Sequence, residues 1–160
     1  MYSDSSEGLN KENNKAIFFF TPSFHPLDNF SAHRIDIWNI SFPTAEHAYQ
    51  CKKFNHNKDI SNQILLARSP EKANQIGKQH RDQIPQGWHD QKVAIMKEIL
   101  RAKAEQNHDV QKALQRSGNK EIIENSPVDN FWGNGPDNDG KNMIGKIWME
   151  LRKEQTTNGK

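Results

Sequence analysis

The sequence predicts a mainly α-helical, multihelical single domain with a small β-hairpin or minor sheet near the N-terminus. Three observations support this fold class. After residue 43, apolar residues recur every three or four positions in several segments, as they do on the buried face of a helix. Before that point, short runs such as "AIFFF" and "RIDIWNISF" are typical of strands. The chain has 160 residues and 33% hydrophobic residues, which suits one core built from thin apolar stripes.

Two strand regions precede the helices. Residues 16–20 are a short apolar run that ends near a proline, and we expect a buried strand there. Further on, Ile35 and Ile37 alternate with polar residues, and the alternation changes phase at Trp38 and Asn39. Because Asn tolerates the left-handed backbone conformation, this change of phase predicts the tight turn of a small hairpin.

The remaining regular elements are expected to be helices, several of which have a recognisable start or stop. Thr44 is the expected N-cap of the first helix, and Glu46 lies in its first turn. Ser69 is the expected cap of a later helix that has Pro70 at its first position, and Gly118 stops a short one. The expected helices occupy residues 44–54, 59–69, 69–78, about 89–106, 109–118 and about 142–153.

The segments outside these elements differ in what they predict. Residues 1–15 and 155–160 are polar, and we expect disordered tails there, which leaves a single domain over residues 16–154. Residues 124–141 are rich in Gly, Asn, Asp and Pro and are expected to form a long loop. A loop of this length within a compact domain is more often functional than idle.

Composition limits the classes of function. The chain has 22 Lys and Arg against 20 Asp and Glu, a net charge of +2. This balance does not fit a protein that holds nucleic acid by charge alone, but it suits a small anionic ligand or a brief encounter with a polyanion. Cys51 is the single cysteine, which excludes an internal disulfide and suits a reducing compartment. With no apolar run of about 20 residues and no secretory signal, we expect a cytoplasmic protein with no membrane contact and no obligate protein partner.

Three ligand-binding motifs are excluded. "GPDNDGKN" resembles a phosphate-binding P-loop, but Asn142 stands where a hydroxyl would hold magnesium, and no buried strand leads directly into it. The same loop fails as a calcium loop, because Lys146 takes the final position that requires a carboxylate. The histidines form no HxxxH or HExxH pair, and one cysteine cannot build a zinc site. We therefore expect neither a metal nor a cofactor.

The most informative stretch is "FPTAEHAYQCKKF". Wound as a helix, Glu46, Tyr49, Gln50 and Lys53 fall within one polar stripe. In a structural interpretation, Glu46 only stabilises the helix N-terminus and Lys53 lies in water. In a functional one, Glu46 orients water or faces a developing positive charge, and Lys53 neutralises a phosphate or acts as a nucleophilic amine.

Three further groups have the same double interpretation. Trp88 and Trp132 are either core anchors or platforms that stack on a heterocycle. Asp129 caps a turn or belongs to a site. The Gly-rich loop before Asn142 is either a surface turn or a set of amides that, with the following helix, receives phosphate oxygens. Together, the functional interpretations describe a nucleotide-like pocket without a metal.

Read as one series, the motifs resemble the YbiA-like, or NADAR, family, whose name refers to NAD and ADP-ribose. The resemblance covers about residues 17–154. It rests on Asn29-Phe30, "PTAEHAYQCKKF", "SPEKANQIG", Trp88 and Met96, "LRAKAEQ", "ENSPVDNFWG" and "GKNMIGKIWMELR". Two positions depart from the family pattern: Ala104 stands where Phe is usual, and Trp38-Asn39 where the turn is commonly Asp-Gly. Neither departure touches the polar residues, so they bear on packing.

The resemblance implies a mainly helical enzyme that cleaves N-glycosidic bonds. Its substrate would be a ribosylated pyrimidine phosphate of riboflavin biosynthesis, or an ADP-ribose linked to guanine in a nucleotide or nucleic acid. It implies catalytic roles for Glu46, for Lys53 through substrate contact or a Schiff base, and for Asp129. The implied substrate-binding residues are Asn29, Phe30, Tyr49, Gln50, Trp88, Glu124, Trp132, Gly133, Lys141 and Asn142.

Two alternatives stay open at this point. The chain could be a non-catalytic module that recognises ADP-ribose or an NAD derivative through the same pocket. It could also bind nucleic acid through scattered Lys and Arg side chains, an alternative that a shallow salt dependence or the absence of DNA binding would dismiss.

Overall fold

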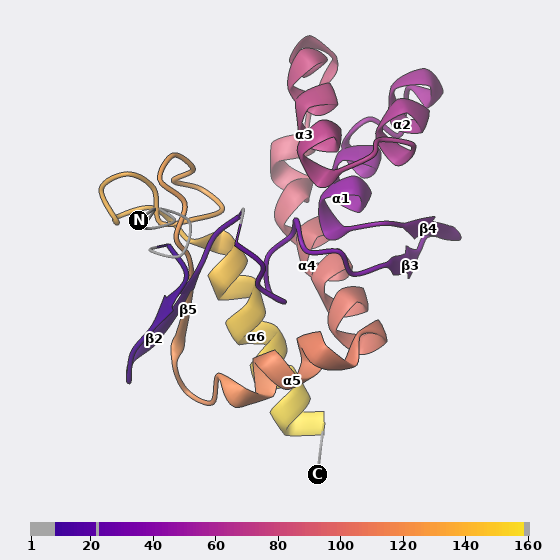
Figure 1. Cartoon of the computed structure of the whole chain (residues 1–160). Helices are drawn as coiled ribbons and strands as arrows, with labels where there is room; N and C mark the ends of the chain where they lie inside the picture. The colour runs from indigo at the N-terminus through magenta and orange to yellow at the C-terminus, as the bar shows by residue number, and fades with distance from the viewer. Residues whose placement is uncertain (1–8, 22, 159–160) are drawn as a thin grey trace, which may run out of the picture. The chain divides into compact units, whose positions relative to one another are not determined.

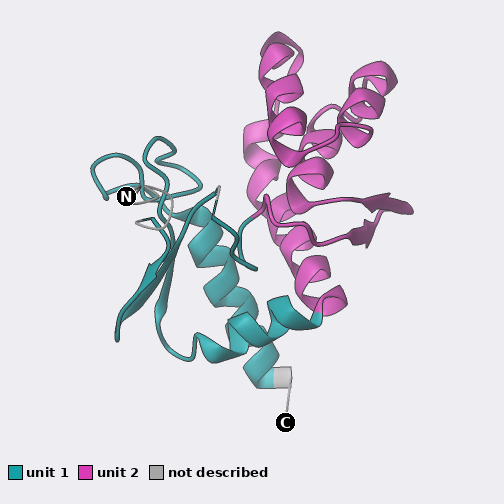
Figure 2. Ribbon diagram, in the orientation of Figure 1, with its two compact units in different colours: residues 1–28, 108–160 teal, residues 29–107 magenta. Residues whose placement is uncertain are grey.

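The computed structural model describes residues 9–21 and 23–158. The chain forms two compact units, residues 29–107 and residues 1–28 with 108–160, which Figure 2 colours separately. Unit 2, the name used here for residues 29–107, contains the hairpin and four of the helices. Unit 1 contains a three-stranded sheet and the last two helices. The expectation of a single domain over residues 16–154 stays a prediction.

Unit 2 begins with the expected hairpin, built from β3 (Ile35–Ile37) and β4 (Ile40–Phe42) (Figure 1). The two strands pair antiparallel, with Ile37 opposite Ile40. Both turn residues, Trp38 and Asn39, have positive φ angles of 55° and 61°. Two consecutive left-handed residues are the conformation of a type I′ turn, which matches the twist of a hairpin. The predicted hairpin is confirmed, including its turn.

Four α-helices and one 3₁₀ turn complete unit 2 (Figure 1). Thr44 Oγ1 accepts a hydrogen bond from the His47 amide (3.1 Å), and Ser69 Oγ accepts one from the Lys72 amide (3.1 Å), so both predicted N-caps are confirmed. Pro70 occupies the first turn of its helix, as predicted. The helices are α1 (Ala45–Lys53), α2 (Lys58–Leu65), α3 (Pro70–Gln79) and α4 (Trp88–Gln106), with η1 (Arg81–Gln83) before α4.

Several polar side chains are buried in unit 2, among them Lys103 and His47. Lys103 of α4 is fully buried and donates a hydrogen bond to Ser31 Oγ (2.7 Å). His47 is also buried, and its two ring nitrogens lie 2.8 Å from Thr44 Oγ1 and 3.0 Å from the Ala67 carbonyl oxygen. Burial lowers the pKa of His47, and the hydrogen bond to Ala67 and the charge of Glu71 only partly oppose this effect. His47 therefore favours the neutral form in the folded protein.

In unit 1, three strands form a sheet in the order β1-β2-β5. β1 (Lys11–Glu12) pairs antiparallel with β2 (Ala16–Phe19), and β5 (Glu121–Glu124) pairs parallel with β2. The strand over residues 16–19 is thus confirmed, whereas β5 was not predicted from the sequence. A four-residue strand whose partner lies about a hundred residues away leaves no local pattern to recognise.

The two helices of unit 1 are α5 (His108–Arg116) and α6 (Met143–Asn158). Gly118 follows α5 with a φ angle of 56°, the left-handed conformation that ends many helices. Trp148 of α6 is fully buried, and its Nε1 donates a hydrogen bond to the Leu27 carbonyl oxygen (2.9 Å). Among the described residues, no helix combines the length and apolar character needed to cross a membrane.

The mainly helical fold class is confirmed, but the predicted tails need correction. Residues 1–8 of the expected N-terminal tail lie outside the described residues, while Lys11 and Glu12 form β1. Their backbone pairing with β2, and an ion pair between Glu12 and Lys120, hold this segment in place despite its polar composition. At the other end, α6 continues to Asn158, past the predicted boundary at residue 154. Polar composition alone was therefore a poor sign of disorder at both ends.

Candidate active site

A cluster of polar side chains joins α1 to α3 inside unit 2. Glu46 is buried, and its Oε1 accepts hydrogen bonds from Gln50 Nε2 (2.7 Å) and Asn74 Nδ2 (3.0 Å). Gln50 lies one turn further along α1, whereas Asn74 belongs to α3. Two amide donors on one carboxylate oxygen fix the orientation of the carboxylate. Glu46 and Gln50 of the predicted polar stripe are therefore buried and do not form a solvated helix face. The Glu46 carboxylate is already held in one orientation.

Lys53 lies one further turn along the same helix and in an unusual environment for an amine. Its Nζ lies 4.9 Å from the centroid of the Tyr49 ring, a cation–π distance. Burial lowers the pKa of Lys53, the nearby charge of Glu46 partly opposes this effect, and the positive charge of Lys92 adds to it. A lowered pKa increases the neutral fraction of the amine, which is the nucleophilic form.

The two aromatic residues beside Lys53 belong to the core. The Tyr49 and Trp88 rings lie 5.4 Å apart at a tilt of 53°, and both side chains are buried. Trp88, at the first position of α4, thus supports the aromatic ring on which Lys53 rests. The structure gives Trp88 the role of a core anchor, and direct stacking of Trp88 on a ligand stays a prediction.

Two buried acceptors in unit 2 have no hydrogen-bond partner. These are Gln50 Oε1 and Asn29 Oδ1, in side chains that are only 4% and 6% exposed. Asn29 is tied to the start of α1, because its carbonyl oxygen accepts a hydrogen bond from the Glu46 amide (3.2 Å). Its neighbour Phe30 is half-buried. Unpaired buried acceptors are costly in a folded protein, and a ligand that carries hydroxyl or amine donors would satisfy them.

Three residues of this cluster were not predicted from the sequence. Asn74 and Lys92 act on Glu46 and Lys53 from other helices, and no local pattern marks either residue. Gly77 lies within the motif "SPEKANQIG", but its role is visible only in three dimensions. A Cβ atom at Gly77 would collide with Gln50 Oε1 and lie 2.9 Å from Gln50 Cδ, so the absence of a side chain makes room for the carboxamide.

The other predicted residues lie in unit 1, around the long loop that precedes α6 (Figure 2). Asp129 caps a tight turn: its Oδ1 accepts hydrogen bonds from the amides of Phe131 (2.9 Å) and Trp132 (2.8 Å). This is the turn-capping alternative that the sequence left open for Asp129. A catalytic role for Asp129 stays a prediction, and one of its oxygens is already used by the loop.

Asn142 ties the loop to the sheet. Its Nδ2 donates a hydrogen bond to the Ile122 carbonyl oxygen (2.8 Å), and its Oδ1 accepts one from the Glu124 amide (3.0 Å). The Glu124 carbonyl oxygen in turn accepts the Asn134 amide (2.9 Å), and a Cβ atom at Gly133 would lie 2.7 Å from that same oxygen. Asn142 and Gly133 thus serve the packing of the loop on β5.

The hydrogen bonds of this loop favour the surface-turn alternative over a phosphate site at the start of α6. The amides of Gly140, Lys141, Asn142, Met143 and Ile144 all donate hydrogen bonds to backbone carbonyl oxygens of the same loop, at 2.7 to 3.0 Å. An amide that is used in this way is not available to a phosphate oxygen. The loop folds back on the helix N-terminus and satisfies it, which a sequence rich in Gly and Asn does not reveal.

Lys141 and Trp132 are predicted substrate-binding residues of this loop whose side chains are exposed or partly exposed. The Lys141 side chain is exposed, with its Nζ 5.7 Å from the centroid of the Phe131 ring. Trp132 is half-buried and meets Phe131 edge to face at 4.8 Å. A substrate-binding role for Lys141 and for Trp132 stays a prediction.

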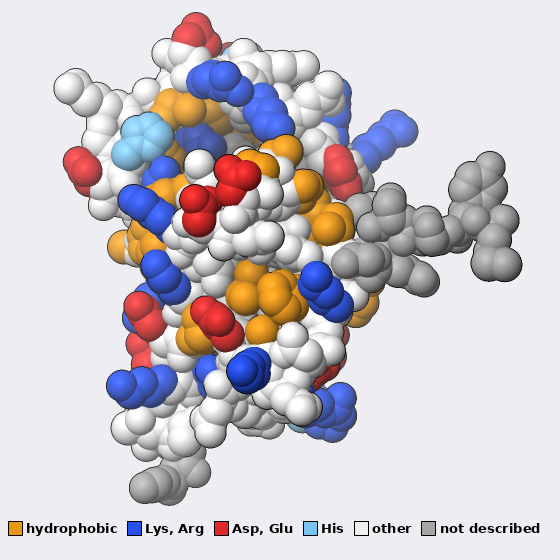
Figure 3. Space-filling view, turned by 90° about the vertical axis from the view of Figure 1, so that its left-hand side faces the viewer, with side chains coloured by type: hydrophobic (Ala, Val, Ile, Leu, Met, Phe, Trp, Pro, Cys, Tyr) orange, Lys and Arg blue, Asp and Glu red, His pale blue; other side chains and the backbone are white. Residues whose placement is uncertain are grey.

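A metal site and a nucleic-acid-binding surface each require a particular grouping of side chains. No group of three or more His, Cys, Asp or Glu side chains suited to a metal ion occurs in the described part of the chain. On the face that Figure 3 shows, Lys and Arg side chains are interspersed with Asp and Glu. This face offers no broad basic patch of the kind that binds nucleic acid through many phosphate contacts.

Comparisons with known proteins agree with the motif series. Residues 10–155 match the NADAR domain. An N-glycosidase of Nostoc punctiforme is 38% identical over 130 residues, covering 80% of this chain and 83% of that protein. N-glycosidase YbiA of Escherichia coli is 31% identical over 140 residues, covering 86% and 87% of the two chains.

Two further matches concern a longer protein and a solved structure. A riboflavin biosynthesis protein of Vibrio vulnificus is 31% identical over 140 residues, which cover 86% of this chain but only 38% of that longer protein. The solution structure of Escherichia coli YbiA is similar over 99% of this chain and 95% of that chain, with a TM-score of 0.82 and 27% identity.

Proposed function

Because the chain belongs to the NADAR domain family, we propose that it is an N-glycosidase, a hydrolase that cleaves the bond between ribose C1 and a base nitrogen. The names of the curated relatives support the hydrolysis of an N-glycosidic bond. For the substrate, we propose a phosphorylated, nucleotide-like molecule. It is either the ribosylamino-pyrimidine phosphate of riboflavin biosynthesis or an ADP-ribose linked to guanine.

The single observation that carries the proposal is that α1 places the buried Glu46 carboxylate near enough to Lys53 for its charge to act on that amine. Loss of the base gives the ribose oxocarbenium character, and a fixed carboxylate stabilises that positive charge. Glu46 suits this role, because Gln50 and Asn74 hold its Oε1 in place. Because the hydrogen bonds from Gln50 and Asn74 are present before the substrate binds, the carboxylate does not have to reorient during the reaction.

Lys53 supplies the second group of the proposed chemistry. Its lowered pKa makes a neutral amine more available than at an exposed lysine. In the proposal, this amine contacts the ribose or attacks C1, so that the C1–N bond breaks and the base leaves with a proton. The sugar ring then opens to give a Schiff base between Lys53 and C1, which water hydrolyses to the free sugar and the amine. The unpaired oxygens of Gln50 and Asn29 would receive hydroxyl or amine donors of the substrate.

The test is mass spectrometry of purified protein incubated in EDTA with both substrates in parallel. We expect release of the base from one substrate, and loss of that activity in Glu46→Gln. Glu105→Gln, an exposed change on α4, is the matched control and should keep full activity. Release of the base at the wild-type rate by Glu46→Gln would refute the role of Glu46. Intact substrates in both reactions would favour a module that only binds ADP-ribose, and titration with ADP-ribose would then follow.

A second arm of the experiment tests Lys53. Borohydride reduction during turnover should fix the sugar to the wild-type protein if a Schiff base forms. Lys53→Arg keeps the positive charge but should abolish the adduct, while Lys78→Arg, on the exposed side of α3, should not. Turnover without an adduct would assign Lys53 to substrate contact alone.

A further inference from the structure

Unit 2 contains a hollow that none of the candidate catalytic residues lines. It lies between the β3–β4 hairpin, α1 and α2, and has a volume of about 300 Å³, within the size range of small-ligand sites. Its apolar wall includes Trp38, Ile40 and Phe42, and its polar side includes Lys52, Lys58 and Asn62. Glu46 and Lys53 do not contribute to this lining. The hollow is therefore separate from the polar cluster on α1.

The charge of this hollow is positive and not neutralised by the protein. Lys52 and Lys58 line it, and no Asp or Glu does. Within the described residues, neither lysine forms an ion pair. Like charges that share one concave surface repel each other unless an anion joins them. An anionic ligand would remove this repulsion.

The apolar wall is held in place at a conformational cost. Trp38 has a φ angle of 55°, in the left-handed region that is unfavourable for a bulky L-residue. Its indole is fixed on three sides: Nε1 donates a hydrogen bond to Glu98 Oε1 (3.1 Å), Lys52 Nζ lies 4.6 Å from the ring centroid, and Phe42 meets it edge to face at 6.2 Å. A strained residue held by several contacts is a sign of function.

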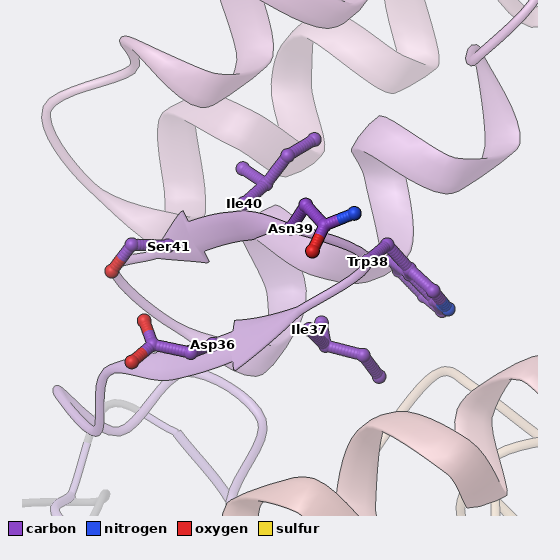
Figure 4. Close-up of a pocket in the computed structure, with 6 residues that line it drawn as sticks. All are labelled: Asp36, Ile37, Trp38, Asn39, Ile40 and Ser41. Carbon is purple, nitrogen blue, oxygen red and sulfur yellow. The ribbon is translucent and has the colours of Figure 1, made fainter.

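The hairpin presents this indole together with other accessible apolar surface. Figure 4 shows Trp38 at the tip of the turn, where the indole projects outward from the strands. Ile40, two residues on, is 41% exposed and lines the same hollow. A flat aromatic ring and an exposed aliphatic side chain next to two ammonium groups that form no ion pair suit a ligand with a planar apolar part and a negative charge.

We propose that this hollow binds one nucleotide unit, with its phosphate on Lys52 and Lys58 and its base against Trp38 and Ile40. The carboxamide of Asn62 supplies a donor and an acceptor for the edge of the base. The same chemistry is present in a free nucleotide and in one unit of a single-stranded nucleic acid. The proposal does not depend on the glycosidase activity, because the site shares no residue with the proposed catalytic cluster.

The experiment is a titration of the full chain followed by NMR at the indole N–H resonance of Trp38, assigned with Trp38→Phe. The probes are adenosine monophosphate, inorganic phosphate and a short single-stranded oligodeoxyadenylate. We expect saturable shifts with adenosine monophosphate and at least tenfold weaker binding of inorganic phosphate. No shift at millimolar adenosine monophosphate, or equal affinity for inorganic phosphate, would overturn the proposal.

Lysine variants test the charged side of the hollow. Lys52→Gln and Lys58→Gln should each weaken binding, and the double variant should weaken it at least tenfold. Lys112→Gln, an exposed change on α5, is the matched control and should bind like the wild type. Unchanged binding by the double variant with an intact circular dichroism spectrum would also overturn the proposal.

The oligonucleotide arm separates the two sources of the ligand. If the strand binds more tightly than the mononucleotide, the natural ligand is nucleic acid, and with two lysine contacts the salt slope of log K should be about −1.4. If both bind equally, the ligand is a free nucleotide. Either result supports a nucleotide site.

Discussion

Gly77 offers a sharp test of how α3 controls the proposed catalytic carboxylate. In Gly77→Ala, the new methyl group would overlap Gln50 Oε1 and lie 2.9 Å from Gln50 Cδ. The clash is with the end of a flexible side chain, so the carboxamide can rotate away while the backbone stays in place. That rotation would break the 2.7 Å hydrogen bond from Gln50 Nε2 to Glu46 Oε1. Gly77→Ala therefore disturbs the site from a position that is not one of the proposed substrate contacts.

The expected effects on stability and on activity differ in size. Replacing a helical Gly by Ala stabilises a helix by about 1 kcal/mol, and this gain offsets part of the lost hydrogen bond. A hydrogen bond to a charged group contributes about 1.5–3 kcal/mol. We therefore expect a free energy of unfolding within about 2 kcal/mol of the wild type. If that hydrogen bond acts on the transition state, turnover should fall about tenfold to a hundredfold.

A double-mutant cycle with Gln50→Ala checks this reasoning. The measurements are urea unfolding and the turnover of whichever substrate proves active. In the Gln50→Ala background the carboxamide is already absent, so Gly77→Ala should cost no further activity and should raise stability. Equal losses in both backgrounds, or full activity of a folded Gly77→Ala, would refute the coupling. If neither substrate is cleaved, the side-chain amide resonances of Gln50 report the same displacement.

Three further predictions concern residues outside this coupling. Burial lowers the pKa of His47 below its ordinary value of 6.5, so the unfolded chain takes up the proton first as pH falls. The contribution of His47 to the free energy of unfolding should therefore be fully present above about pH 6.5 and be lost as the pH falls below that value. In His47→Gln, the free energy of unfolding measured in urea should decline less over the same pH range. Asn142→Ala removes the partners of the Ile122 carbonyl and the Glu124 amide. It should lower the free energy of unfolding by about 2–4 kcal/mol, and a wild-type urea midpoint would contradict that role. Burial raises the pKa of Cys51 to about 12, so the thiol should react with a disulfide reagent at pH 8 only after unfolding. Rapid reaction in native buffer, followed at the released chromophore, would show that the thiol is accessible.

Local chemistry in the sequence was enough to predict most of the secondary structure. The caps at Thr44 and Ser69 use side-chain oxygens that satisfy amides three residues away, so the information lies within one turn of helix. The hairpin turn is equally local, because the change of phase at Trp38 and Asn39 marks it directly. The candidate residues Glu46 and Lys53 were also accessible, since helical spacing alone places them on one stripe.

The tertiary structure decided what those residues do. Asn74 reaches Glu46 across 28 positions, and β5 finds β2 across about a hundred, so neither contact leaves a periodic signal. The long loop illustrates the same limit: its sequence left both a surface turn and a phosphate site open, and in the structure its amides and Asn142 form hydrogen bonds to the loop and the sheet. Short-range hydrogen bonding and hydrophobic spacing can be read from neighbouring residues. The partners of buried polar groups cannot be read in this way, because they come from distant parts of the sequence and are determined by how the whole chain packs.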